Sequence, residues 1–464
     1  MGNNKDGAIY NARELGTGKT LVLGLQHLFA MFGATVLVPI LTGLSVSATL
    51  LFAGLATLFC HFVTKRKVPV FLGSSFAFLG GYFAVVAAGK DAGLEAAKAL
   101  PYACVGVACA GLLYLVLAFV CKTVGSKKVM KFFPPVVTGP IIIAIGLILA
   151  PSAINNCKDC WWVALIAIAV VVACNIWGKG MIKIVPILMG VLVSYVVAAI
   201  AGKVDFTEVA QAKWIGLPVA WENTVFGLFG DKVDTGLLIS AIITIVPIAV
   251  ATMMEHVGDI SAIGSTVGQN FIEDPGLHRT LIGDGVGTTI AALFGAPANT
   301  TYGENTGVLA LTKVYDPFVI RLAALYAIVL SFCPKFAAII HVMPVATIGG
   351  VSLILYGMIS AIGVRNMVEN HTDFQKSRNV IVAAVILGLA LGINFSGLLG
   401  ADITTAGNNA TGAISFTIGS VKIGLSGLAV ASIAGIVLNA ILPDKDVEHV
   451  ENLNENLSGS LGKY

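Results

Sequence analysis

Acidic residues inside apolar sequence are the features of this chain that could do chemistry. Glu255 and Asp259 lie one helical turn apart in an apolar stretch, and Glu304 lies in a short polar break, GAPANTTYGENTGVLALTK, between hydrophobic segments. Placing an ionised side chain at the centre of a bilayer costs about 3 kcal/mol or more, so such residues usually mark functional sites. With Asp284 as a fourth acid, they predict a polar cavity that handles protons and a hydrogen-bonding solute.

Each of the three main acids has a functional and a structural interpretation. A carboxylate such as Glu304 can accept hydrogen bonds from two adjacent ring N–H groups, or it can form an ion pair with a nearby Lys or Arg. Glu255 and Asp259 share a helix face because they are four residues apart. Two buried acids that close repel each other, so one tends to stay protonated and could carry a proton. Alternatively, Asp259 lies at the cytoplasmic end of its helix, where water reaches it.

Other polar residues in these stretches fit supporting roles. Asp284 either orients Glu255 or His256 through hydrogen bonds or is an acid at a helix end. His27 and His256 fit packing between helices better than catalysis, as polar side chains often do in membranes. A lone CxxC at 157–160 lacks the second ligand pair of a zinc site. The sequence shows no nucleophile elbow, nucleotide-binding fold or nucleic-acid surface, so we expect no enzyme activity, no metal and no nucleic-acid partner.

The composition places these residues in a membrane. Of the 464 residues, 57% are hydrophobic and 11% are charged, whereas soluble domains have about 25% charged residues. Because a spanning helix needs about 20 apolar residues, the sequence predicts an all-α polytopic membrane protein. We expect about fourteen segments, at residues 18–43, 46–63, 70–88, 101–121, 130–152, 159–177, 182–202, 236–262, 278–296, 299–314, 317–333, 335–363, 377–397 and 410–441.

The third and tenth segments are short and broken. Each follows a proline, Pro69 or Pro297, and begins with small polar residues, LGSSFAF and NTTYGEN. Their backbone amides need partners inside the protein or in a water-lined cavity. We expect a short extended piece that leads into a half-helix in each, with the two helix N-termini pointing toward each other. Free amides there suit a carbonyl or anionic ligand. The alternative is a glycine-rich kink packed against its neighbours.

The two halves of the chain show an internal repeat. Gln26-His27 precedes Ser75-Phe76 by 49 residues, and Glu255-His256 precedes Glu304-Asn305 by the same 49 residues. The stretch FPPVVTGPIIIAIGLIL (132–148) is echoed by MPVATIGGVSLILYGMI (343–359). Two halves of seven segments each must have inverted topology, because seven is odd. Inverted repeats with interrupted segments at matching positions are typical of transporters with a central site.

Lys and Arg concentrate on one side of the predicted segments. With the N-terminus inside, most of the 28 basic residues fall in the inside loops and tails. The positive-inside rule therefore predicts that residues 1–17 and 442–464 are cytoplasmic tails. A single transmembrane unit, 18–441, lies between them.

Five stretches resemble one known family. They are QHLFAMFGATVLVPILTG (26–43), VPVFLGSSFAF (68–78), EHVGD (255–259), DPGLHR (274–279) and NTTYGENTGVLALTK (299–313). These stretches are similar to the nucleobase–ascorbate transporter family of nucleobase:cation symporters, with the bacterial uracil permeases as the most similar branch. The resemblance covers roughly residues 18–440, and ENTGVLALTK fits the family's signature.

The resemblance implies a proton-coupled uracil importer of the bacterial inner membrane. It implies a core domain (about 18–121 and 236–333) that moves against a gate domain (about 130–202 and 335–441). The proton is the only expected cofactor, and the expected partners are uracil, membrane lipid and a second copy in a homodimer. The implied solute contacts are Glu255, Glu304 and the backbone of Phe76 and Gly303, with Ala34, Ser75, Tyr302 and Tyr356 as the lining. The candidates for the proton are Glu255, Asp259 and Asp284.

Two positions depart from the uracil branch. That branch has His at the position of Asp259 and Asn at the position of Asp284, whereas acids at both positions resemble the xanthine branch. A xanthine carrier or a broader nucleobase symporter therefore stays open. An inorganic-anion transporter or channel of the same architecture also stays open, although an acid-lined pocket disfavours anions. An intramembrane hydrolase is weaker, because no Ser/His or metal-ligand set accompanies the acids.

Overall fold

Helices make up most of the regular structure in the computed structural model, which describes residues 8–230, 233–396, 413–418 and 421–443. Up to the long central loop they are η1 (Ala12–Leu15), α1 (Thr17–Thr42), α2 (Val46–Val63), α3 (Leu79–Asp91), α4 (Ala96–Val124), α5 (Ser126–Met130), α6 (Pro135–Cys157), α7 (Trp161–Trp177), α8 (Met181–Ile184) and α9 (Pro186–Ile200). The loop holds α10 (Thr207–Gln211), η2 (Trp221–Asn223) and η3 (Val225–Gly230).

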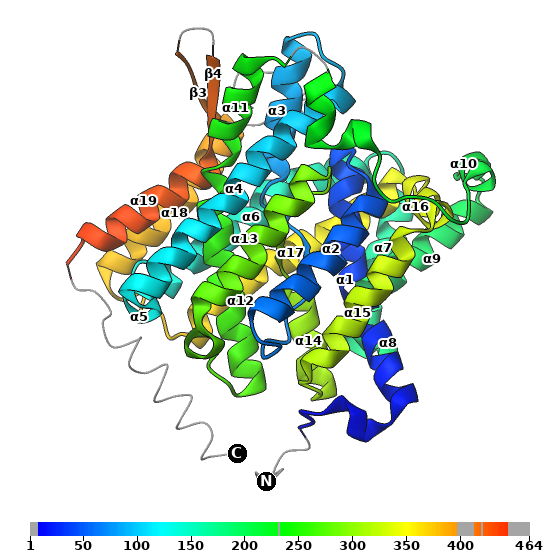
Figure 1. Ribbon diagram of the computed structural model, residues 1–464, viewed down its shortest axis with the longest axis horizontal. Coiled ribbons are helices and arrows are strands. Elements are labelled where there is room, and N and C mark those ends of the chain that lie inside the picture. The colour runs from blue at the N-terminus through cyan, green and yellow to red at the C-terminus, as the bar shows by residue number, and fades with distance from the viewer. Residues whose placement is uncertain (1–7, 231–232, 397–412, 419–420, 444–464) are drawn as a thin grey trace.

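The second half is again mainly helical. It contains α11 (Thr235–Ile245), α12 (Ile248–Val267), η4 (Ile272–Gly276), α13 (Leu277–Leu293), α14 (Gly303–Thr312), α15 (Pro317–Ser331), α16 (Pro334–His341), α17 (Val345–Glu369), α18 (Ser377–Ser396) and α19 (Gly427–Ile441). The described residues also form two antiparallel strand pairs, β1 (Leu72–Ser74) with β2 (Asn299–Thr301), and β3 (Ala413–Ile418) with β4 (Val421–Ser426). Figure 1 shows the β3–β4 pair at the upper end of the bundle.

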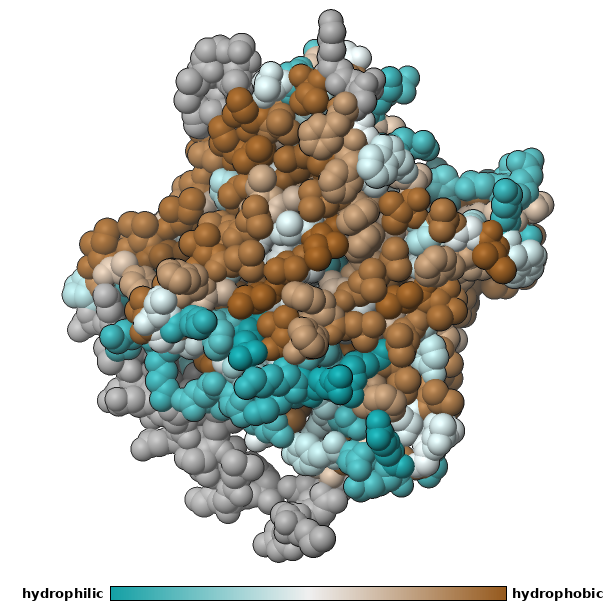
Figure 2. Space-filling view, in the orientation of Figure 1, coloured by the Kyte–Doolittle hydropathy of each residue, from teal (hydrophilic) through white to brown (hydrophobic). Residues whose placement is uncertain are grey.

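The outer surface of the bundle suits a bilayer. Large apolar side chains face outward, including Phe119, Trp177 and Val329, which are 67%, 73% and 69% exposed. Figure 2 shows a broad apolar belt over the helices, with hydrophilic residues gathered below it over α5 and the lower ends of α2 and α12. Within the described residues, seven helical spans are long and apolar enough to cross a membrane, or eight if α15 and α16, bent by 88°, count as one. The chain is therefore a multi-pass membrane protein.

Several predicted segments agree with single helices. The prediction of 46–63 matches α2, and those of 18–43 and 377–397 match α1 and α18 to within one residue. Helices α7, α9 and α19 are shorter, at 17, 15 and 15 residues. Helices α3, α13, α14 and α15 are also short, at 13, 17, 10 and 15 residues. All seven fall below the 18 residues that mark a spanning helix, so in the described residues seven spans rather than fourteen meet that criterion.

Two predicted segments are broken at prolines. The segment 335–363 is not one helix, because α16 ends at His341 and α17 begins only after Pro344. The segment 236–262 divides into α11 and α12 at Pro247. Proline lacks the backbone N–H that would continue the helical hydrogen bonds, so a helix tends to kink or restart there.

The prediction of a helix over 410–441 is wrong for residues 413–418 and 421–426, and residues 419–420 lie outside the described part of the chain. The two described stretches form β3 and β4, and the helix α19 begins only at Gly427, capped by the Ser426 side chain. The strand sequences AISFTI and VKIGLS alternate large apolar residues with smaller or polar ones, which is the two-residue period of a strand. Residues 410–412 lie outside the described residues, as do 1–7 and 444–464 of the predicted tails.

Glycines let α6 and α17 cross closely. A Cβ atom added to Gly146 would lie 2.2 Å from the Tyr356 carbonyl oxygen, and one added to Gly363 would lie 2.7 Å from the Gly139 carbonyl oxygen. Small residues at such crossings let helix backbones approach inside a membrane. The contact fixes Tyr356, one of the residues expected to line the solute site, against α6.

Candidate solute site

Two short strands bring the broken segments together. In the β1–β2 pair, Leu72 lies opposite Thr301 and Ser74 opposite Asn299. The Ser75 backbone N–H extends the contact by donating to the Ala298 carbonyl oxygen over 2.8 Å. The pairing satisfies backbone groups that the apolar interior of a membrane could not satisfy. Because the strands are antiparallel, α3 and α14 leave the pair in opposite directions, so the expected extended piece followed by a half-helix is confirmed in both segments.

The first turn of α14 carries Glu304. Gly303 is the first residue of this helix, and both residues are half-buried. Among the described residues, a Cβ atom added to Gly303 would have one neighbour within 4 Å, the Ile362 side chain of α17 at 3.7 Å. The first backbone N–H groups of a helix have no intrahelical partner. The start of α14 therefore presents N–H groups that have no partner within the helix beside the Glu304 carboxyl, which interacts with its own backbone N–H.

The α12 helix presents Glu255 and Asp259 toward this break. The Asp259 Oδ2 atom accepts a hydrogen bond of 2.5 Å from the Thr301 hydroxyl of β2. Glu255 interacts electrostatically with Asp259, Asp284 and Glu304. Asp259 is thus half-buried and tied to the broken segment, rather than at a fully exposed helix end. The structure brings the acids of α12 and α14 into one polar region.

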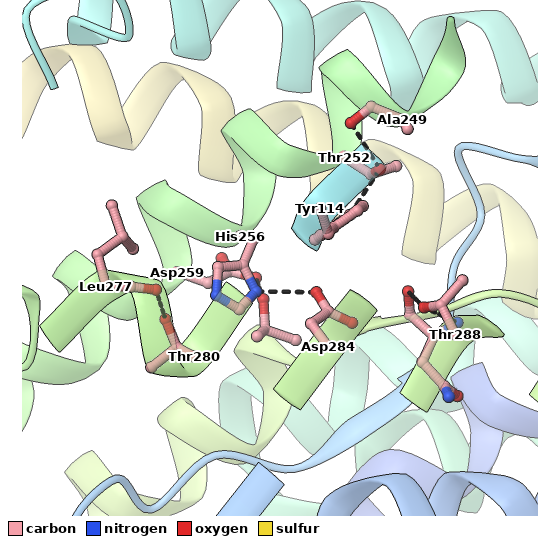
Figure 3. Close-up of polar contacts among 11 residues, drawn as sticks. Tyr114, Ala249, Thr252, His256, Asp259, Leu277, Thr280, Asp284 and Thr288 are labelled. Atoms are coloured by element: carbon pink, nitrogen blue, oxygen red, sulfur yellow. Dashed lines mark hydrogen bonds and ion pairs between the residues drawn. The ribbon is translucent and has the colours of Figure 1, made fainter. Parts of the chain in front are cut away.

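Asp284 has a direct partner in His256. Figure 3 shows His256 of α12 and Asp284 of α13 pointing toward each other, and His256 Nδ1 lies 2.8 Å from Asp284 Oδ2. Both side chains are fully buried. Of the two sequence-based interpretations, the structure supports the one in which Asp284 orients His256. Asp284 lies in the second turn of α13, inside the helix rather than at its end.

Aromatic residues close one side of the polar region. The Phe76 ring, between β1 and α3, meets the Tyr356 ring of α17 edge-on, with centroids 5.7 Å apart. The Tyr302 hydroxyl donates to the Ser74 carbonyl oxygen over 2.9 Å, which links the two broken segments a second time. Phe76, Tyr302 and Tyr356 are all buried, and Tyr302 interacts electrostatically with Glu304 and Glu255.

The remaining predicted lining residues are fully buried. Ser75 is inaccessible, and its hydroxyl has no partner among the residues that the structure describes. Ala34 lies on α1 with no exposed surface. The next residue, Thr35, accepts a hydrogen bond of 2.8 Å at its carbonyl oxygen from the Ser74 hydroxyl. These contacts place α1 behind β1 and leave Ser75 as an unused donor near the break.

Two polar residues of the site were missed by the sequence interpretation. Thr301 bonds Asp259, as described above. The Asn305 amide, one residue after Glu304, donates to the His27 carbonyl oxygen over 3.1 Å and lies 3.2 Å from His27 Nδ1. The two-residue period of a strand could have suggested Thr301 as a site residue, because it places the polar side chains of Asn299 and Thr301 on the same face of β2. Within the described chain, no group of three or more His, Cys, Asp or Glu residues could hold a metal ion.

Chemically, this arrangement can hold a small neutral ring that has both donors and acceptors. Carboxylates accept from ring N–H groups, while backbone N–H groups at a helix start donate to carbonyl oxygens. A site of this kind is mostly apolar with a few convergent polar groups, which is the usual character of a small-molecule pocket.

Comparison with known sequences gives matches over nearly the whole chain. The Permease family model (Xan_ur_permease) matches residues 18–399. The uracil permease of Bacillus caldolyticus is 40% identical over 447 residues, covering 94% of this chain and 95% of that protein. The uracil permease of Escherichia coli strain K12 is 37% identical and covers 91% of each chain. A putative pyrimidine permease, RutG, of the same strain is 35% identical over 96% of this chain and 94% of its own.

Comparison with solved structures shows the fold alone. The transmembrane domain of the cyanobacterial bicarbonate transporter BicA superposes with a TM-score of 0.61 at 13% identity, covering 93% of this chain and 99% of that one. The structure of SLC26A9 gives a TM-score of 0.59 at 11% identity, covering 93% of this chain and 66% of that one. These TM-scores show a shared fold, and identities this low carry no information about the solute.

Proposed function

Since the chain belongs to the Permease family and is therefore a multi-pass membrane transporter rather than an enzyme, we propose that it imports uracil together with protons. The solute assignment is supported by relatives named uracil permease that cover nearly the whole chain. The observation that carries the proposal is that Glu255 of α12 interacts electrostatically with Glu304, in the first turn of the helix that follows the β1–β2 pair.

The proposed binding mode follows from the chemistry of the ring. Uracil presents ring N–H groups beside carbonyl oxygens. Glu304 and Glu255 accept from the N–H groups, and the backbone at Gly303 and Phe76 donates to the carbonyl oxygens. Ser75, Ala34, Tyr302 and Tyr356 line the rest of the site. In this mode every polar edge of the buried ring has a partner, which keeps the cost of removing it from water low.

The proposed proton carrier lies on α12. Asp259 is the first choice, because its bond to Thr301 links it to the strand that leads into Glu304. Glu255 is the second choice. Asp284 is already engaged by buried His256, which favours a structural role for it. A proton on Asp259 removes one negative charge from the cluster. The repulsion on Glu255 and Glu304 then falls, so a carboxylate that contacts the solute can stay ionised.

The proposed architecture has fourteen segments in two inverted repeats of seven. Residues 18–121 and 236–333 form the core that carries the solute, and 130–202 and 335–441 form the gate against which the core moves. One end of the bundle carries Lys122, Lys127, Lys128 and Lys131 and is called the lysine-rich end. This end faces the cytoplasm together with both termini, as the positive-inside rule favours. The protein resides in the inner membrane of a bacterium and can pair as a homodimer.

Uptake into vesicles tests the function directly. Purified protein is reconstituted into proteoliposomes, a pH gradient is imposed, and uptake of labelled uracil is measured with and without excess xanthine. We expect uptake that depends on the gradient and is not competed by xanthine. Efficient competition by xanthine would instead indicate a broader nucleobase carrier.

A matched pair of variants ties the function to the site. Glu304→Ala should abolish uracil uptake, because it removes an acceptor for the ring N–H groups. Glu222→Ala makes the same change in the exposed loop helix η2 and should leave uptake unchanged. Full uptake by Glu304→Ala at normal expression would refute this solute site.

A further inference from the structure

A cavity separate from the acid cluster opens at the lysine-rich end of the bundle. Its volume is about 600 Å³, and Glu255, Asp259 and Glu304 are not among its lining residues. Its walls come from the end of α4, from α5 and from α12 on one side, and from the starts of α6 and α18 and the end of α17 on the other. The proposed core and gate therefore both contribute to it.

Arg378 gives this cavity a buried positive charge. The side chain lines the cavity but is only 9% exposed. Its guanidinium donates to the Asn379 side-chain oxygen and to two oxygens of Asn439, at 3.1, 3.0 and 2.6 Å. All three acceptors are neutral, and its Nε has no partner in the described part of the chain. A buried cation without a counter-charge is costly, so this position calls for an anion.

Lysines reinforce the positive charge at the same cavity. Lys122, Lys127, Lys128 and Lys131 all contribute to the lining. Lys127 is paired with Glu273 at 2.9 Å. The other three form no salt bridge with an acid in the described residues. Only one of the four lysines is neutralised there, so the cavity has a clear excess of positive charge.

The rest of the lining is apolar and adjoins the lipid-facing surface. Val124, Phe133, Val136 and Val257 contribute apolar side chains. Val124 is 50% exposed and continues the outward apolar face of α4 that includes Phe119. Figure 2 shows the hydrophilic patch at α5 directly beneath the apolar belt. A ligand here meets positive groups at the level of lipid headgroups and apolar walls on the membrane side.

We propose that this cavity binds an anionic phospholipid of the leaflet at the lysine-rich end. Its phosphate is held by Arg378 and the unpaired lysines, and part of an acyl chain lies along Val124, Phe133 and Val136. A lipid supplies both the anion that Arg378 lacks and the apolar group that the walls accept, whereas a free inorganic anion supplies only the first. Basic pockets between transmembrane helices at this level are known lipid-binding features.

Binding is measured on the delipidated full-length protein in neutral detergent. The probes are phosphatidylglycerol, phosphatidylcholine and inorganic phosphate, and the readouts are retained lipid by native mass spectrometry and the melting temperature. We expect phosphatidylglycerol to be retained and to raise the melting temperature, with little effect of the other two. Equal binding of phosphatidylcholine, or stabilisation by inorganic phosphate alone, would overturn the proposal.

Charge variants locate the site. Lys122→Gln, Lys128→Gln and Lys131→Gln together should weaken phosphatidylglycerol binding, by about fivefold for each charge in contact with the lipid. The control removes three exposed basic residues outside this cavity, Lys65→Gln, Lys179→Gln and Lys183→Gln. Arg378→Gln should have the largest effect, and Arg378→Lys tests whether charge alone restores binding if the glutamine variant fails to fold.

The acidic C-terminal sequence is the competing occupant. It includes Asp444, Asp446 and Glu448, a few residues after Asn439 of the cavity wall. A full-length variant with Asp444→Asn, Asp446→Asn and Glu448→Gln separates the two occupants. Unchanged lysine-dependent retention of phosphatidylglycerol supports the lipid site. The lipid site would be overturned if, in this C-terminal variant, replacing Lys122, Lys128 and Lys131 no longer reduced the retention of phosphatidylglycerol.

Discussion

At the scale of single residues, the buried pair of His256 and Asp284 should contribute measurably to stability. Asp284→Ala leaves the His256 Nδ1 atom without a partner in a fully buried position. An unsatisfied buried polar group costs about 1–3 kcal/mol, so we expect a lower melting temperature in detergent. Asp284→Asn retains a side-chain oxygen that can accept a hydrogen bond and should lose less.

An exposed pair of the same type is the control for this prediction. His341 Nδ1 and Glu208 Oε2 lie 2.9 Å apart, but their side chains are 70% and 52% exposed. Exposed ion pairs contribute about 0–1 kcal/mol. Glu208→Ala should therefore hardly change the melting temperature. Equal losses in Asp284→Ala and Glu208→Ala would contradict the structural role of the buried pair.

The bond between Asp259 and Thr301 predicts how proton coupling fails. Asp259→Asn cannot release a proton, so uracil uptake should no longer respond to an imposed pH gradient. Exchange of labelled for unlabelled uracil across the vesicle should continue, because Glu255 and Glu304 remain. Thr301→Val removes only the hydroxyl that donates to Asp259 and should reduce the response without abolishing it. A gradient response of normal size in Asp259→Asn would assign the proton to another acid.

Sequence reasoning predicted the acids of the candidate site but not all of the polar contacts around them. Placing a charged side chain in a membrane costs free energy, so Glu255 and Glu304 stand out in apolar sequence as candidates for function without any knowledge of the fold. The partner of Asp259 is Thr301, 42 residues away, and the partner of Asn305 is His27, 278 residues away. Neither pairing has a local signal in the sequence, because both depend on how β2 and α14 pack against other helices.

At the scale of elements, the β1–β2 pair depends on a glycine. A Cβ atom added to Gly73 would lie 2.5 Å from the Tyr302 ring and 2.8 Å from the Thr35 hydroxyl. Gly73→Ala should therefore displace Tyr302 or the strand, with a loss of about 1–3 kcal/mol typical of overpacking. Because Tyr302 directly precedes Gly303, we also expect weaker uracil binding, measured by isothermal titration.

A nearby glycine serves as the control for the strand. A Cβ atom added to Gly80, in the first turn of α3, would meet no atom within 4 Å. Gly80→Ala should therefore leave both the melting temperature and the affinity for uracil close to wild type. If Gly73→Ala behaves like Gly80→Ala, close packing at β1 does not position Tyr302.

Element boundaries were predictable where one signal dominates. The segment 46–63 coincides with α2 because apolar residues fill it and Ser45 caps its start. The break at Pro344 was missed because apolar residues continue on both sides of it. The β3–β4 hairpin was missed because hydropathy alone does not distinguish a short apolar strand from a helix. In membrane sequences, composition finds the apolar segments, while capping and periodicity decide what they become.

At the scale of the whole molecule, movement of the proposed core against the proposed gate should be blocked by a crosslink between them. A Cβ atom added to Gly258 of α12 would lie 4.0 Å from Asn366 Nδ2 of α17, with no closer atom than Ile142 Cδ1 at 3.9 Å. These two positions face each other across α12 and α17, so Gly258→Cys with Asn366→Cys is the pair to oxidise, and mass spectrometry measures how much disulfide forms. We expect uracil uptake to stop on oxidation and to return on reduction.

A second cysteine pair sharing position 366 distinguishes this movement from general damage. Thr138 Oγ1 of α6 lies 2.9 Å from Asn366 Nδ2 of α17, and both helices belong to the proposed gate. Thr138→Cys with Asn366→Cys, once its disulfide is detected by mass spectrometry, should leave uptake intact, because the gate would move as one body. Parent protein with its eight native cysteines, oxidised in parallel, gives the background. Normal uptake by the crosslinked 258–366 pair would show that transport does not require the proposed core and gate to move apart. The solute would then have to reach Glu304 by a local opening of α14.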